Sequence, residues 1–187
     1  MRRRRLFKPT RTPGRWGRAI AVGTAAVLGV SFVAIGLPSE LMGSAPRNQE
    51  WSSPPAQIRI VDGDTLRMGE RTLRLYGVDA PERGQFCTDE GGRLYDCGTA
   101  AAAELARLVG DRGVSCRVQG RDRFGRALGV CQAGDVELNA SIVTNGWALA
   151  DGGSLPALVP VEAAARAAQR GLWRGGFEPP SHWRRGN

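Results

Sequence analysis

Three short clusters of acidic residues and arginines are the parts of this 187-residue sequence best suited to chemistry. The first, at residues 62–64, places two carboxylates at a predicted strand junction. The second, at residues 74–82, gathers an arginine and two acids near the end of a predicted strand. The third, at residues 121–126, puts three arginines at the predicted tip of a hairpin. Because a guanidinium is a planar fork that pairs bidentately with phosphate, the third cluster is a candidate phosphate clamp.

Ordinary structural explanations compete for the first and third clusters. Asp-Gly is a frequent turn sequence, and a charged hairpin tip is usually just solvated. The second cluster is harder to explain in this way. Arg74 shares alternation with Tyr76 and Val78 on the predicted strand, so its charge is expected to point toward an apolar face. Such an arginine needs a partner or a place at a barrel mouth.

The elements that position these clusters follow from alternation, turn residues and helical spacing. A helix is expected from an N-cap at Thr99 to Val109, where Gly110 ends it. A later helix is expected to open at Pro160 and stop at Gly171. The other predicted elements are strands at 57–61, 65–68 and 71–78, a long loop at 80–98, a hairpin of strands 114–118 and 127–132, and a helix at 139–144.

This order of elements indicates an α+β protein. The expected architecture is a five-stranded OB-fold β-barrel with about three helices, preceded by one N-terminal transmembrane or signal helix. We place the domain at residues 56–174, between a linker at 38–55 and a tail at 175–187 that contains Pro, Arg and Trp. The open face of an OB-fold commonly binds oligonucleotides, although a fold by itself does not establish a function.

The three clusters, in this order and at these separations, resemble the staphylococcal nuclease (thermonuclease-like) family over residues 56–174. The resemblance implies a calcium-dependent endonuclease that hydrolyses phosphodiester bonds of DNA and RNA. Its carboxylates are all-oxygen ligands of the kind that a hard divalent cation prefers. Residue by residue, it implies Asp64, Asp79 and the backbone carbonyl of Ala80 as calcium ligands, Asp62 as a ligand through water, Arg74 and Arg126 as phosphate-binding arginines, and Glu82 as general base.

Several positions depart from the family pattern. Ala80 stands where the family enzyme has Thr, and Phe124 replaces a Tyr at the hairpin tip. The tyrosines that flank the nucleotide base in the family enzyme have no clear match in residues 147–151. These changes leave the phosphate chemistry in place and alter the expected base site. The alternative function is a non-catalytic module of the same fold that binds nucleic acid or another anionic polymer.

Four cysteines lie after residue 86, and four cysteines allow three pairings. Cys116 and Cys131 lie in predicted strands separated by a turn, while Cys87 and Cys97 bracket a Gly-rich loop. We therefore predict the disulfides Cys87–Cys97 and Cys116–Cys131. A zinc site is disfavoured because no Cys-x-x-Cys occurs and the single histidine, His182, lies in the tail.

The amino-terminal region has the pattern of a membrane anchor. Residues 19–37 carry no charge over about the length that a helix needs to cross a bilayer. Residues 1–18 hold eight bases and no acid, which predicts a cytoplasmic flank and an extracytoplasmic domain, in the periplasm or at the cell surface. Secretion after signal cleavage is the alternative, although Pro46 would follow the small residues 43–45 at the cut.

The charge of the chain follows the same division. The net charge is +8, and residues 1–18 alone carry +8, so residues 19–187 balance to zero. The global charge therefore gives no support for nucleic-acid binding, and any attraction for phosphate must come from local arrangement. A monomer is the default expectation.

Overall fold

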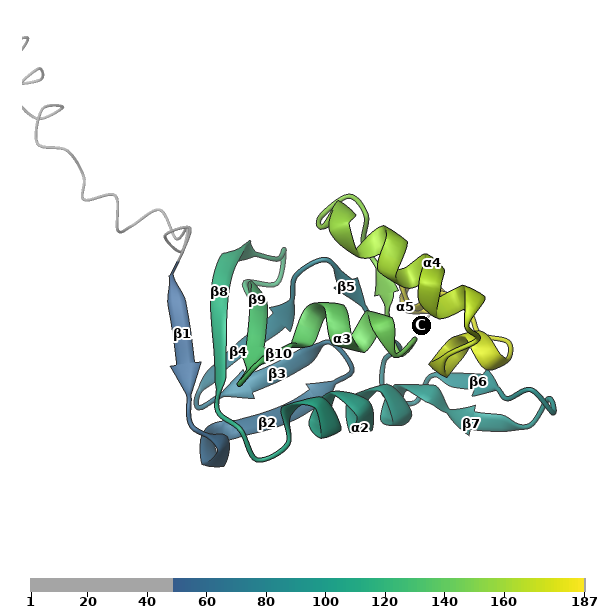
Figure 1. Ribbon diagram of the computed structural model, residues 1–187, viewed down its shortest axis with the longest axis horizontal. Helices are drawn as coiled ribbons and strands as arrows, with labels where there is room; N and C mark the ends of the chain where they lie inside the picture. Colours follow the sequence, from purple (N-terminus) through teal and green to yellow (C-terminus); the bar gives the residue numbers. More distant parts are fainter. Residues whose placement is uncertain (1–48, 187) are drawn as a thin grey trace, which may run out of the picture. The chain divides into compact units, whose positions relative to one another are not determined.

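The computed structural model describes residues 49–186, which form an α+β domain built on a mixed sheet (Figure 1). Seven strands belong to this sheet, in the order β1-β8-β9-β4-β3-β2 with β10 paired to β9. Two small sheets, β5 with β11 and β6 with β7, complete the strand pairing.

The bounds of the elements are as follows. The strands are β1 Glu50–Ser53, β2 Ile58–Asp62, β3 Thr65–Met68, β4 Arg71–Leu75, β5 Val78–Asp79, β6 Phe86–Thr88, β7 Leu94–Asp96, β8 Val114–Arg121, β9 Ala127–Ala133, β10 Val136–Glu137 and β11 Leu149–Ala150. The α-helices are α2 Cys97–Val109, α3 Leu138–Thr144, α4 Val159–Ala167 and α5 Pro180–Gly186, and short 3-10 turns are η2 Pro55–Gln57, η3 Pro156–Leu158 and η4 Gly171–Arg174.

The predicted meander is confirmed in β2, β3 and β4, but the strand expected over 71–78 is wrong. β4 ends at Leu75, and Gly77 turns the chain with a φ of 73° before β5 pairs with β11 instead. The prediction that Arg74 points toward the apolar face, which rested on alternation along that strand, is therefore also wrong. Leu73 and Leu75 face the core, whereas Arg74 lies on the opposite face of the strand.

The predicted hairpin is confirmed as β8 and β9, both longer than expected. β9 also pairs with β4 in parallel, with Arg74 beside Leu128. This parallel pairing joins the first half of the domain to the second. It brings the strand that carries Arg74 next to the turn at residues 121–126.

The helix predicted to have its N-cap at Thr99 has its N-cap three residues earlier. Asp96 is the N-cap, and its carboxylate accepts bonds from Thr99 N at 2.8 Å and Thr99 Oγ1 at 2.7 Å. Gly110 ends the helix with a φ of 56°, as predicted. α2 packs with its buried face, including Ala101 and Leu105, against β2 and α3.

Other expectations need correction. Among residues 49–186 the main sheet is a path of six strands with β10 paired to β9, and no strand pairing closes it into the expected five-stranded barrel. Four α-helices are described rather than about three. The loop at 80–98 contains the hairpin β6–β7. α4 ends at Ala167, before Gln169 turns the chain with a φ of 48°.

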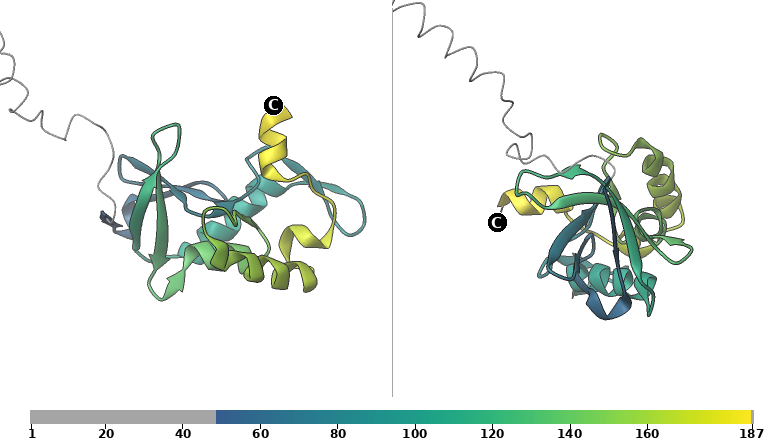
Figure 2. Two further views of the ribbon diagram at one scale, coloured as in Figure 1. Left: turned by 90° about the horizontal axis from the view of Figure 1, so that it is seen from above. Right: turned by 90° about the vertical axis from the view of Figure 1, so that its left-hand side faces the viewer.

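Both regions expected to flank the domain contribute ordered elements to it. The predicted linker at 38–55 includes β1, which pairs antiparallel with β8 and buries Trp51. The tail at 175–187 includes α5, which lies on the opposite side of the domain from α4 in both views of Figure 2. The expected membrane segment at 19–37 lies outside the described residues. Within residues 49–186, no helix combines the length and apolar character needed to cross a bilayer.

Both predicted disulfides are confirmed. Cys116 and Cys131 are direct cross-strand partners in β8 and β9, and both are buried. Cys87 and Cys97 tie the hairpin β6–β7 to the first residue of α2. No cysteine of the described domain is free.

We expect the double variant Cys116→Ala/Cys131→Ala to lose about 3 kcal/mol of unfolding free energy, because this disulfide closes a loop of 15 residues in the unfolded chain. Urea unfolding of the full-length chain without reductant measures the loss. Reductant should bring the wild type toward the variant. Equal stability of the two proteins without reductant would contradict the prediction.

Candidate active site

Arg74 lies at the centre of the carboxylate cluster. Its Nη1 donates to Asp64 Oδ1 at 2.8 Å, and its Nη2 lies 2.7 Å from Asp64 Oδ2 and 3.0 Å from Asp79 Oδ1. The Asp64 side chain is only 1% exposed and that of Arg74 12%. One guanidinium thus pairs with two carboxylates, Asp64 in the turn between β2 and β3 and Asp79 in β5. A buried carboxylate requires a partner of this kind.

The backbone places these groups through close packing at the β2–β3 junction. Gly63 lies so near α2 that a Cβ there would meet Ala101 Cβ at 2.6 Å and Ala80 Cβ at 2.8 Å. The register sets Thr65 opposite Arg74, and Leu75 N donates to Asp64 O at 2.8 Å. Asp64 is therefore fixed beside Arg74 by the sheet itself. The Asp-Gly sequence at residues 62–63 is a packing requirement as well as a turn.

Asp64 also accepts bonds from two uncharged donors, Thr65 Oγ1 at 2.9 Å and Ala80 N at 2.9 Å. Burial nevertheless raises the pKa of Asp64 to about 6, despite the opposing effects of Arg74 and of both hydrogen bonds. Burial and then the charge of Glu82 also raise the pKa of Asp62. The cluster therefore holds more negative charge than its surroundings fully stabilise.

Ala80 has a role in this structure that the sequence did not predict. The expectation concerned its carbonyl, whereas the observed bond is from its backbone N–H to Asp64. The carbonyl as a metal ligand stays a prediction. Within residues 49–186, Asp62 makes no hydrogen bond or ion pair with Arg74; its carboxylate lies 3.9 Å from Arg83 Nε.

Glu82 is held in place by the start of α2. A Cβ on Gly98 would collide with the carbonyl oxygen of Glu82, so only glycine permits this approach. Gln85 N donates to that same carbonyl at 2.9 Å, and Cys97 N donates to Gln85 O at 3.0 Å. The Cys87–Cys97 disulfide therefore lies in the segment that fixes the predicted general base.

The residue that sequence reasoning missed is Arg184, in α5. Its Nη1 donates to Glu82 Oε1 at 2.9 Å and its Nη2 to Asp79 Oδ1 at 2.6 Å. Burial lowers the pKa of Arg184, but the bonds to Asp79 and Glu82 outweigh burial and raise it. Prolines at 179 and 180 were a signal for a helix start, but nothing in the tail indicated where that helix would lie.

Arg126 is not joined to the carboxylates by any hydrogen bond or ion pair among residues 49–186. Its Nε bonds instead to Asp122 Oδ2 at 2.7 Å, and Asp122 also accepts from the backbone of Phe124 and Arg126, which shapes the turn. Because Leu128 lies beside Arg74, Arg126 is two residues away along the chain, one residue before β9 begins, which at the rise of extended chain is about 7 Å. That spacing is within the reach of an arginine side chain.

A cleft of about 390 Å³ opens beside the cluster. Arg74, Asp79 and Arg184 line it, and Asp151, Ser154 and Ser181 form other parts of its wall. It is therefore the space in which a substrate could meet the predicted site residues.

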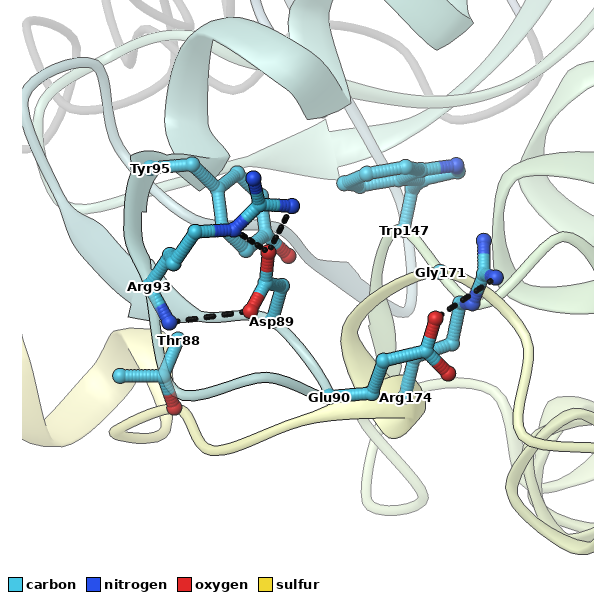
Figure 3. A pocket seen from close by; sticks show the side chains of 8 residues that line it. All are labelled: Thr88, Asp89, Glu90, Arg93, Tyr95, Trp147, Gly171 and Arg174. Carbon is cyan, nitrogen blue, oxygen red and sulfur yellow. Dashed lines mark hydrogen bonds and ion pairs between the residues drawn. The ribbon is translucent and has the colours of Figure 1, made fainter.

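A second cleft of about 440 Å³ lies between the hairpin β6–β7 and η4 (Figure 3). The rings of Tyr95 and Trp147 line it, and two ion pairs, Arg93 with Asp89 and Arg174 with Glu90, contribute to its wall. None of the predicted catalytic or metal-binding residues lines this cleft. Trp147, from the segment where the family enzyme's base-flanking tyrosines were sought, lies here and not in the first cleft.

The carboxylates at and beside the first cleft fit a hard divalent cation in their chemistry. Asp62, Asp64 and Asp79 offer only oxygen, and burial raises the pKa of the first two. In the arrangement described, guanidinium groups of Arg74 and Arg184 supply the positive charge. Within residues 49–186, no three His, Cys, Asp or Glu side chains are gathered closely enough to hold a metal ion as they stand.

Comparison with known proteins identifies the family. Residues 72–175, more than half of the chain, match the family described as Staphylococcal nuclease homologue, and the chain belongs to that family. This membership makes the domain an SNase-like α+β fold and supports a nuclease.

Individual relatives agree with this membership. The succinoglycan biosynthesis protein ExoI of Rhizobium meliloti is 35% identical over 121 residues, which is 63% of each chain. An uncharacterized endonuclease of Escherichia coli is 31% identical over 135 residues, 68% of this chain and 82% of its own. A micrococcal nuclease of Shigella flexneri is 33% identical over 146 residues, 68% of this chain and 78% of its own.

We expect Asp64→Asn to be more stable than the wild type at pH 8 in chelator, by on the order of 2–3 kcal/mol. The native state holds the Asp64 proton up to a pKa of about 6, against 3.8 for an ordinary aspartate, so ionisation costs native stability as pH rises between these values. The advantage of the variant should disappear as pH falls to about 4.

Urea unfolding across this pH range, with chelator present, measures the difference. Asp135→Asn, which changes an exposed carboxylate in a turn, is the matched control. A wild type that is as stable as Asp64→Asn at pH 8 would contradict the predicted cost of the buried charge.

Proposed function

We propose that this protein is a calcium-dependent endonuclease that hydrolyses phosphodiester bonds of DNA and RNA in the cleft beside Arg74. The observation that carries the proposal is that Arg74 pairs with both Asp64 and Asp79. Glu82 is connected to the same group, because Arg184 bonds to both Glu82 and Asp79. Membership of the staphylococcal nuclease family supports it, as do relatives whose names include endonuclease and micrococcal nuclease.

The residues that would hold calcium are Asp64, Asp79 and the carbonyl of Ala80, with Asp62 acting through water. When bound, calcium supplies positive charge to a phosphodiester and to a nearby water. The two strand junctions that carry Asp64 and Asp79 keep these ligands in one place, because Arg74 and the sheet register connect them.

Glu82 is the proposed general base. Its carboxylate would accept a proton from a water molecule as the water oxygen attacks phosphorus, and the bond from phosphorus to the leaving sugar oxygen would break. The leaving oxygen then takes up a proton from solvent. The backbone contacts of Glu82 with Gly98 and Gln85 support a fixed position for this group.

Arg74 and Arg126 are the proposed donors to the phosphate. Negative charge grows on the non-bridging oxygens in the transition state, where fixed guanidinium donors stabilise it most. Arg74 is held rigidly by its carboxylates. Arg126 would have to turn from Asp122 toward the cleft. Its position two residues before Leu128, the β9 residue that pairs with Arg74, supports that reach.

We also infer that the domain lies outside the cytoplasm, attached by the apolar segment at 19–37 or released after its cleavage. Two disulfides in a domain of this size support an oxidising compartment. Protease added to cells whose cytoplasmic membrane is intact should digest the domain, once any outer layer of the cell envelope has been made permeable. Digestion that requires lysis of the cytoplasmic membrane would contradict the inference.

We expect Glu82→Gln to lower the rate of DNA cleavage by on the order of 10²–10⁴, because the amide cannot accept the proton of water. Single-stranded DNA and RNA incubated with the full-length chain, with calcium or with chelator, measure the rate. Chelator should abolish cleavage by the wild type. Glu70→Gln, which changes an exposed glutamate, is the control and should cleave at the wild-type rate.

Arg126→Ala should lower the cleavage rate by about 10²–10³ through the loss of one donor to the transition state. Arg123→Ala removes an exposed arginine from the same turn, where its guanidinium lies 4.7 Å from the ring centre of Phe124, and should change the rate less than threefold. Equal losses in both variants would indicate that the turn acts only through its general charge. Calcium-independent binding of nucleic acid without cleavage would favour the non-catalytic module instead.

A further inference from the structure

Arg184 connects the C-terminal helix to the two carboxylates that the proposed mechanism needs. It bonds to Glu82, 102 residues earlier in the chain, and to Asp79, 105 residues earlier. Its side chain is 35% exposed and lines the same cleft as Arg74. The contact is therefore part of the site and not a distant surface ion pair.

The oxygen that Arg184 contacts is already shared. Asp79 Oδ1 accepts from Arg74 at 3.0 Å and from Arg184 at 2.6 Å, so two guanidinium groups converge on one carboxylate atom. A divalent cation bound at Asp79 would lie beside the charge of Arg184, and like charges at such separations repel strongly in a partly buried site. The interaction of Arg184 with Asp79 and the binding of calcium to Asp79 therefore weaken each other.

The start of α5 is held by a hydrogen bond and by burial. Gln85 Nε2 donates to the carbonyl of Glu178 at 2.7 Å, just before the helix, and Pro180 is buried at its start. Within α5 itself, Arg184 makes ion pairs to both acids, while Arg185 makes no ion pair within residues 49–186. These two ion pairs therefore connect α5 to the carboxylates of the active site.

We propose that Arg184 is a built-in counter-cation of the active site, which pairs with Asp79 and Glu82 until calcium displaces it from Asp79. Calcium binding then weakens the attachment of α5 and opens the cleft that α5 helps to line. This inference rests on the proposed calcium dependence. To that function it adds Arg184 as a positioning residue, and it couples calcium binding to the attachment of α5.

Calcium affinity tests the competition directly. Titration calorimetry with calcium chloride, without nucleic acid, is carried out on the full-length wild type, Arg184→Gln and Arg185→Gln. The two variants change neighbouring residues of one helix and remove the same charge. We expect Arg184→Gln to lower the calcium Kd by on the order of three- to tenfold, because a charge-assisted contact no longer competes, and Arg185→Gln to leave it within twofold.

An unchanged or higher Kd in Arg184→Gln, with calcium still binding to the wild type, would overturn the competition and leave the proposed function standing. Calcium binding by Arg184→Gln alone would support it. Failure of calcium to bind to any of the three proteins would overturn the competition together with the proposed calcium dependence. An equal gain in both variants would also overturn it, because net charge alone would then explain the change.

Hydrogen–deuterium exchange of residues 178–186 tests the linkage to α5 without any measurement of activity. In chelator, Arg184→Gln should exchange faster than the wild type in this segment, and Arg185→Gln should not. Addition of calcium should speed exchange in the wild type and have little further effect on Arg184→Gln. Calcium that slows exchange of α5 in the wild type would contradict the release of the helix.

Discussion

The paired burial of Asp64 and Arg74 is the interaction on which the rest of this site depends. A carboxylate that is 1% exposed needs a fixed partner, and the register of β3 against β4 provides it by setting Thr65 opposite Arg74. Arg74 then reaches Asp79 as well, so the ends of two strand connections are joined through one side chain. The sheet, and not a flexible loop, therefore determines where the acidic groups meet.

Around this centre the chain adds parts that hold the remaining groups in reach. The Cys87–Cys97 disulfide and the close approach of Gly98 fix the segment that carries Glu82. The parallel pairing of β9 with β4 brings the turn that carries Arg126 to the same face of the sheet. The C-terminal helix supplies Arg184 from the far end of the chain, and its charge offsets an excess of carboxylates that burial makes costly. A bound divalent cation, as proposed, would offset the same excess of negative charge.

Sequence patterns predicted the elements whose causes are local, and they failed where distant packing decided. The meander, the β8–β9 hairpin, the glycine end of α2 and both disulfides follow from alternation and turn residues. The strand expected through residue 78 failed because Gly77 adopts a positive φ, and the alternation assigned to Arg74 failed with it. β1 and α5 were missed since each is short and is stabilised by contacts with distant segments, β8 in one case and the active-site acids in the other.

The sequence by itself determined which residues were candidates for the site, because the acids and arginines occur in three recognisable clusters, and it determined the family through their order and spacing. Only the tertiary structure decided how those groups are paired. It placed Arg74 between Asp64 and Asp79, kept Arg126 on Asp122, and brought Arg184 to Glu82. The physical reason is that such pairings depend on strand register and helix docking between segments far apart in the chain, which local periodicity does not encode.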